Sequence, residues 1–168
     1  MKPKDFVNKF LPDALEVENE IGISAVATLT QAALESAWGN IAPGNMFFGV
    51  KDTDGINGNE QLITTTEYSS RANLKFPQII SVTPVIRNGR KMFKYKVKDY
   101  FRKYATPADC FRDHSQFFLK NKRYAEALKV AHDHNKFFDE IAKAGYATDP
   151  NYAKTLKAVS KSIVKFIN

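Results

Sequence analysis

Glu35 is the residue whose surroundings point most clearly to chemistry. Its neighbours are small and apolar, in the segment Thr30–Gly39, which is unusual for a solvated glutamate. It falls in the last turn of a predicted helix, where the helix dipole disfavours an anion, so this position and burial both raise its pKa. A carboxylic acid that stays protonated near neutral pH can serve as the general acid of glycoside hydrolysis. The alternative is a surface glutamate that contacts the helix end.

Glu67 is the second candidate carboxylate. It lies near the end of a threonine-rich segment, Thr64–Tyr68, that reads as a strand. Glycoside hydrolysis commonly pairs a protonated acid with an ionised partner. We therefore expect Glu67 to face Glu35 from a separate lobe, with an outward-facing strand residue as the alternative.

Two aromatic segments are candidate sugar-binding surfaces. Asn45–Lys51 contains Phe48 and follows closely on Glu35, and Tyr146 and Tyr152 flank a turn with the sequence Ala-Thr-Asp-Pro-Asn. Sugars bind by stacking on aromatic rings and by hydrogen bonds from groups such as the Asn45 amide. The alternatives are a buried loop for the first segment and a capped helix start for the second.

Other polar groups give weaker signals. His132-Asp133-His134 has no evident third ligand, so we interpret it as a solvated turn rather than a metal site. Cys110 is the one cysteine, which excludes an internal disulfide, and we expect a buried, inert thiol. We therefore expect neither a metal nor a cofactor.

Helices dominate both ends of the sequence. We predict helices over Pro3–Glu20, from a Ser24 cap to Trp38, from a Thr106 cap onward, over 124–131 and 135–144, and from Asp149-Pro150 to the end. Between them, a turn-rich stretch (42–59) leads into strands at 62–68 and 78–86, and Pro84 marks an edge or a bulge. Asn88-Gly89 is a hairpin signal, and after it Phe93, Tyr95 and Val97 alternate with lysines. The order of elements predicts an α+β protein.

Composition sets further limits. The chain has 168 residues and a net charge of +7, which suits an anionic partner. No apolar run approaches the roughly 20 residues of a membrane-spanning helix. The N-terminus is not followed by an apolar signal core, so either the chain is not secreted by the usual route or a leader has been removed. We expect one catalytic domain over 1–168, with a helical lobe at about 1–58 and 100–168 and a β lobe at about 59–99.

Taken together, these segments resemble the peptidoglycan glucosaminidases of glycoside hydrolase family 73. The resemblance covers nearly the whole chain, and its last stretch is the most specific. It rests on five stretches in the family's order: Thr30–Gly39, Asn45–Lys51, Thr64–Tyr68, Asp99–Tyr104 and Ala144–Ala153. One departure is a longer segment, Arg71–Val85, where the family commonly has a shorter hairpin.

The resemblance implies a lysozyme-like fold, in which a helical lobe and a small antiparallel β lobe flank a glycan-binding groove. It implies hydrolysis of the β-1,4 bond after N-acetylglucosamine in peptidoglycan. By resemblance the catalytic residues are Glu35, Glu67 and Tyr146, and Trp38 supports the helix of the acid from behind. The residues that we expect to bind substrate are Asn45, Phe48, Ser36, Tyr68 and Tyr152.

Other functions stay open at this level. An N-acetylmuramidase of the same fold, or a peptidoglycan-binding module without catalysis, would use the same surfaces. Nucleic-acid binding through the lysine-rich run Lys91–Lys103 is the remaining reading, and we expect no nucleic-acid partner. We expect a monomer that acts outside the cytoplasm, in the periplasm, at the wall or secreted, or a phage enzyme delivered to the wall.

Overall fold

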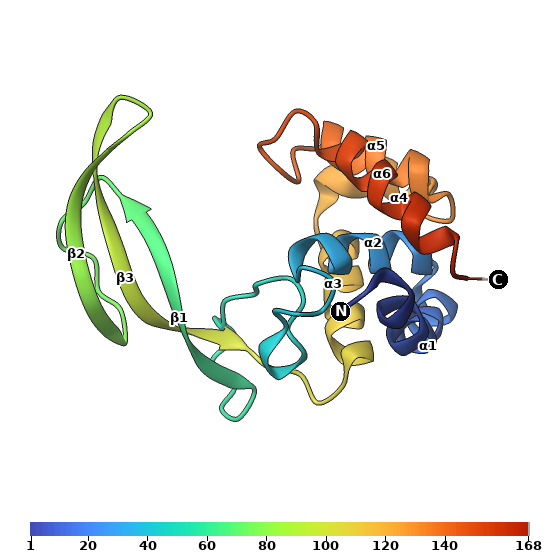
Figure 1. The fold of residues 1–168 in the computed structure, drawn as a ribbon, viewed down its shortest axis with the longest axis horizontal. Coiled ribbons are helices and arrows are strands. Elements are labelled where there is room, and N and C mark those ends of the chain that lie inside the picture. The colour runs from blue at the N-terminus through green and yellow to red at the C-terminus, as the bar shows by residue number, and fades with distance from the viewer. Residues whose placement is uncertain (168) are drawn as a thin grey trace. The chain divides into compact units, whose positions relative to one another are not determined.

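A computed structural model describes residues 1–167 of the chain (Figure 1). It divides into two compact units: a helical unit made of Met1–Phe48 and the chain from Tyr104 onward, and a sheet unit, Gly49–Lys103. The sheet unit extends beyond residues 59–99 on both sides. Helices and a small antiparallel sheet confirm the α+β class. Within residues 1–167, no helix combines the length and apolar character that crossing a membrane requires.

Within residues 1–167, six α-helices build the helical unit, together with short 3₁₀ turns at Pro43–Asn45 and Lys122–Tyr124. Its longest helix begins with Pro3 in the first turn and ends at Gly22, which adopts a left-handed φ of 90°. The helices are α1 (Pro3–Ile21), α2 (Ala25–Glu35), α3 (Pro107–Lys120), α4 (Ala125–Lys129), α5 (His134–Lys143) and α6 (Tyr152–Val164).

Helix α2 carries Glu35 as its last residue. The Ser24 hydroxyl accepts a hydrogen bond from the Ala27 N–H, which confirms Ser24 as the cap. The predicted end at Trp38 is wrong, because Ala37 and Trp38 have positive φ angles of 49° and 58° that a helix does not tolerate. The chain therefore turns directly after the acid.

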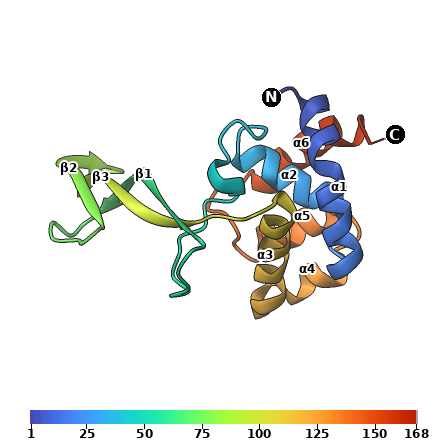
Figure 2. The ribbon, with the colours of Figure 1, turned by 90° about the horizontal axis from the view of Figure 1, so that it is seen from below.

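The helical unit has two hydrophobic clusters, and α2 contributes to both. Leu29 belongs to the cluster that α1 and α3 also line, whereas Ala27 belongs to the cluster formed with α4, α5 and α6. Helix α2 packs against α1, α5 and α6 (Figure 2). Because it is enclosed along its length, its exposed end is held rigidly.

The sheet unit consists of three antiparallel strands, β1 (Glu60–Ser69), β2 (Gln78–Arg87) and β3 (Arg90–Arg102), in the order β1-β3-β2. Asn88 and Gly89 both have positive φ and form the predicted two-residue hairpin turn. Strand β2 lies at an edge, as Pro84 indicated, while the register shift falls between Ile79 and Ser81.

The two faces of this sheet differ in character. Tyr95 and Val97 are fully buried on the face that also carries Glu67, which is paired with Tyr95 in the register; we call this the glutamate face. The other face carries Lys94, Lys96 and Lys98 and is called the lysine face. The predicted alternation along β3 is thus confirmed.

The loop between β1 and β2 packs onto the glutamate face. The Tyr95 hydroxyl donates to the Arg71 carbonyl oxygen at 2.5 Å and accepts the Leu74 N–H at 3.4 Å. The Phe76 ring lies 5.6 Å from the Tyr95 ring. The first part of the Arg71–Val85 segment therefore buries Tyr95.

Candidate active site

Glu35 is open to solvent, yet its carboxyl is partly dehydrated by the surrounding protein. Desolvation raises the pKa of Glu35, and a hydrogen bond from Tyr152 opposes this shift. The residue as a whole is exposed, so the sequence-based expectation of burial holds only for part of the side chain. The upward direction of the pKa shift agrees with the expectation. A carboxyl in this state is accessible and is biased toward its protonated form.

A hydrogen-bond chain leads from the interior to Glu35. His114 Nε2 lies 3.0 Å from Gln31 Oε1, and Gln31 Nε2 donates to the Tyr152 hydroxyl at 3.1 Å. The Tyr152 hydroxyl in turn hydrogen-bonds the Glu35 carboxyl. Gln31 lies one helical turn before Glu35, so α2 supplies both residues on one side. We call this set the Gln31 chain.

The direction of the Gln31 chain follows from the charge state of His114. Burial lowers the pKa of His114 to about 3, so its ring is neutral at physiological pH. Since the amide oxygen of Gln31 can only accept, His114 carries its proton on Nε2 and donates it. Each group then donates toward Glu35. Phe48 stacks on the His114 ring, with centroids 3.7 Å apart and planes 8° apart, and fixes its orientation.

Tyr146 and Tyr152 belong to one stack of aromatic rings. Their centroids are 5.5 Å apart, and Tyr146 also stacks on Phe118 at 5.6 Å. Burial raises the pKa of both tyrosines, so both hydroxyls stay protonated and can donate. The amide of Gln31 also hydrogen-bonds Tyr146, which links the second tyrosine to the same chain.

Asn45 and Ser36 are occupied by backbone contacts. The Asn45 amide donates to the carbonyl oxygens of Tyr104 and Ala105, at 3.0 and 3.3 Å. Ser36 is fully buried; its hydroxyl donates to the Ala32 carbonyl at 2.5 Å and accepts the Gly39 N–H at 2.8 Å. Ser36 thus holds the backbone directly after the acid in place, and Asn45 holds the segment before α3.

In the sheet unit, Glu67 is paired with Lys51. The Lys51 Nζ lies 2.9 Å from Glu67 Oε1 and 3.2 Å from Asp99 Oδ2. Partial burial acts to lower the pKa of Lys51, but the hydrogen bonds to the two carboxylates outweigh it and raise that pKa. Tyr68 lies on the lysine face, opposite to Glu67, and the Arg87 guanidinium covers its ring at 3.9 Å. The structure therefore does not bring Tyr68 and Glu67 together.

Gln31, His114 and Lys51 were missed as site residues by the sequence reasoning. His114 follows Phe111 by three residues and precedes Phe118 by four, a spacing that places it on the buried face of α3. Gln31 precedes Glu35 by one helical turn within an apolar run. A buried polar residue needs a partner, so either position signals a hydrogen-bond network.

The remaining polar candidates do not form a site. Burial raises the pKa of Cys110 to about 12, as expected for an inert thiol. Asp133 caps α5 by accepting the Lys136 N–H. Among residues 1–167, no three His, Cys, Asp or Glu side chains are grouped closely enough to hold a metal ion.

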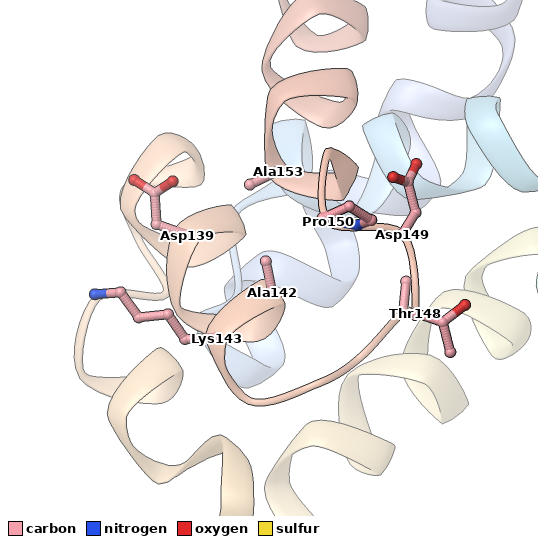
Figure 3. Close-up of a pocket in the computed structure, with 8 residues that line it drawn as sticks. Asp139, Ala142, Lys143, Thr148, Asp149, Pro150 and Ala153 are labelled. Carbon is pink, nitrogen blue, oxygen red and sulfur yellow. The ribbon is translucent and has the colours of Figure 1, made fainter.

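A shallow pocket lies between α5, the loop that follows it and the start of α6 (Figure 3). Ala142 and Ala153 line it between the two helices, and Thr148, Asp149 and Pro150 border it on the loop. Two charged side chains that line the pocket already form ion pairs, Asp139 with Lys157 and Lys143 with Glu140. None of the residues expected to contact substrate lines this pocket.

The chain is similar to several known proteins. It is 33% identical over 96% of its length to the peptidoglycan hydrolase FlgJ of Salmonella typhimurium, and 29% identical over 79% to the exo-glucosaminidase LytG of Bacillus subtilis. It spans 49% and 41% of these two proteins. Among solved structures, it resembles the C-terminally truncated glycoside hydrolase domain of Salmonella typhimurium FlgJ, with a TM-score of 0.71 and 30% identity; the match covers 98% of this chain and 99% of that domain.

The family model described as mannosyl-glycoprotein endo-β-N-acetylglucosaminidase matches residues 11–165. That range includes the whole Gln31 chain and both candidate carboxylates. It confirms the family that the five sequence stretches indicated, and the solved FlgJ domain confirms the fold class. The chain therefore belongs to the glucosaminidase family of glycoside hydrolases.

Proposed function

We propose that this chain is a peptidoglycan hydrolase that cleaves the β-1,4 bond after N-acetylglucosamine in cell-wall glycan strands. The names of its relatives support the substrate, since Salmonella typhimurium FlgJ is a peptidoglycan hydrolase and LytG is an exo-glucosaminidase. The observation that carries the proposal is Glu35, an accessible carboxyl with a raised pKa at the end of a rigid helix.

Glu35 acts as the general acid in this proposal. Its proton passes to the glycosidic oxygen as the bond to the anomeric carbon breaks, which leaves a carboxylate on Glu35. The Tyr152 hydroxyl, a donor at the end of the Gln31 chain, stabilises that carboxylate as it forms. The acid is thus biased toward its protonated form before the reaction and is stabilised as an anion afterwards.

Glu67 and Tyr146 have proposed roles in the attack on the anomeric carbon, each in a different route. The Glu67 carboxylate, which pairs with Lys51, accepts a proton from an attacking water. In a substrate-assisted route, the N-acetyl oxygen attacks instead, and Tyr146, a protonated donor, supports that group. We favour either of these routes over a covalent glycosyl-enzyme intermediate. Among the other residues, Asn45, Phe48 and Tyr152 are proposed to line the sugar site, while Ser36 and Tyr68 hold local structure.

Peptidoglycan lies outside the cytoplasm, so the proposed site of action is the wall, reached by export or by phage delivery. We propose that the protein acts as a monomer, because Glu35 and the hydrogen-bonded residues of the Gln31 chain all belong to one helical unit of one polypeptide.

Wall-clearing assays test this proposal. Wild-type protein should reduce the turbidity of purified sacculi, and Glu35→Gln should abolish that activity while sedimenting with sacculi as wild type does. Full clearing by Glu35→Gln at equal folding would remove Glu35 from the mechanism. Binding without clearing by both proteins would identify a binding module instead.

A further inference from the structure

The lysine face of the sheet unit carries a row of unpaired cations. Lys94, Lys96 and Lys98 occupy alternate positions on β3, so their side chains emerge on one face about 6.8 Å apart. Among residues 1–167, no carboxylate forms an ion pair with any of the three. Arg87 extends the row near the hairpin end, where it lies over Tyr68, the register partner of Lys94.

The residues on either side of this row are uncharged. Thr66 on β1 and Ser81 on β2 are the register partners of Lys96, and Thr64 and Gln78 are those of Lys98. These side chains can donate hydrogen bonds but do not neutralise the lysines. Like charges on one face of one strand repel one another, and an anionic partner relieves this repulsion.

The carboxylates of the neighbouring strand positions lie on the opposite side of the sheet. Glu67 and Asp99 are on the glutamate face, where Lys51 binds both. Because successive side chains of a strand alternate between faces, the lysine row cannot reach these two groups. The two carboxylates thus share Lys51 on the glutamate face, while Lys94, Lys96 and Lys98 have no carboxylate partner among residues 1–167 on the lysine face.

We propose that the lysine face binds a polyanionic wall polymer, an extended chain of sugars or polyols joined by phosphodiester groups. This rests on the proposed function for the location of the protein at the wall. A linear polymer with regularly repeated phosphates matches a linear row of ammonium groups, and the flanking hydroxyl and amide groups supply further hydrogen bonds to phosphate oxygens. The polymer holds the enzyme on its substrate from the face that does not carry Glu67.

Single-stranded nucleic acid is the competing polyanion, and the lysine face suits it less well. Proteins that bind single strands combine a basic groove with aromatic rings on which bases stack. Beside Lys94 the only ring is that of Tyr68, and Arg87 already covers it at 3.9 Å. At the other end of the row, the Tyr100 ring lies two residues after Lys98 on the same face and is 45% exposed. The face thus offers one free ring at its end rather than rings interleaved with the lysines.

Two triple variants with equal charge change test this proposal. Lys94→Gln, Lys96→Gln and Lys98→Gln together remove the row, while Lys4→Gln, Lys120→Gln and Lys161→Gln remove three exposed lysines of the helical unit. The probe is purified, fluorescently labelled poly(glycerol phosphate). We expect the first triple to raise Kd about tenfold, because three exposed ionic contacts, each weak by itself, are lost together, and the second to change it less than twofold. Binding by wild type should also weaken as salt rises.

Several outcomes would overturn the proposal. If both triple variants weaken polymer binding equally, the effect comes from net charge and not from the lysine row. If wild type binds single-stranded DNA more tightly than the polymer, the face is a nucleic-acid site. The row variant should fold at least as stably as wild type, since it relieves repulsion. It should also cleave short soluble glycan fragments at the wild-type rate. Loss of hydrolysis in wild type itself would defeat the proposed function while leaving the polymer measurement intact.

Discussion

Tyr152→Phe removes a single oxygen atom and tests the Gln31 chain directly. Tyr152 is 6% exposed, and its hydroxyl accepts from Gln31 and donates to Glu35. The variant leaves an N–H of the 1% exposed Gln31 without this acceptor, and a buried unsatisfied donor costs about 1–3 kcal/mol. Because the same amide also hydrogen-bonds Tyr146, we expect the lower half of that range, about 1–2 kcal/mol of unfolding free energy.

The same variant changes the pH dependence of hydrolysis in one direction. The Tyr152 hydrogen bond lowers the pKa of Glu35, so its removal raises that pKa further. A general acid must be protonated, and its pKa sets the pH above which activity falls. The alkaline limb of the pH profile should therefore move to higher pH, while the rate at the optimum falls several-fold because the forming carboxylate loses a donor worth about 1 kcal/mol.

Tyr124→Phe is the matched control. Tyr124 is fully buried in the same aromatic cluster, but its hydroxyl has no hydrogen-bond partner among the described residues. Removal of that oxygen should leave stability unchanged or slightly higher and should not move the pH profile. Urea unfolding and pH–rate profiles of the two variants give the comparison. Equal stability and superimposable profiles would refute the chain of hydrogen bonds as an influence on Glu35.

Three further predictions concern Glu35, the ion pair of Lys51 with Glu67, and the close packing around Gly39. Glu35→Gln should be more stable than wild type, by a margin that grows as pH rises through the raised pKa of Glu35, because the carboxylate is disfavoured in the folded state; urea unfolding across pH measures this. Lys51→Met should lower unfolding free energy by about 0.5–1.5 kcal/mol and reduce hydrolysis by the Glu67 route, measured by denaturation and by rate. Gly39→Ala should cost about 2–4 kcal/mol, since its φ is 74° and a new Cβ would lie 3.2 Å from the Phe10 ring, whereas Gly22→Ala, with open space, should cost about 1–2 kcal/mol.

Local signals in the sequence were sufficient for most of the fold. Ser24 as a cap and Asn88-Gly89 as a hairpin turn both appear in the structure, because each depends on backbone chemistry that one or two residues determine. The end of α2 was misplaced because Ala37 and Trp38 take left-handed conformations. Ordinary residues do so only when tertiary packing holds them, and Trp38 packs edge-on against Phe6 of α1.

The candidate site was predictable in part. The type and position of Glu35 indicated a raised pKa, and the structure agrees in direction and cause. The partners of Gln31 were not predictable, because Tyr152 and His114 are 121 and 83 residues away in sequence and meet Gln31 only through the packing of α2 on the rest of the unit. The sequence also did not indicate that the Asn45 amide N–H groups donate to backbone carbonyls on the segment before α3; the contact of Asn45 with a sugar stays a prediction.

The most direct test of the central claim is to identify the sugar at the new end of the cleaved glycan strand. Purified peptidoglycan is digested with wild type and with Glu35→Gln, the fragments are reduced, and the reduced terminal sugar is identified by mass spectrometry. We expect reduced N-acetylglucosamine with wild type and none with Glu35→Gln. Reduced N-acetylmuramic acid would make the chain a muramidase, and products from Glu35→Gln at the wild-type rate would contradict the role of Glu35.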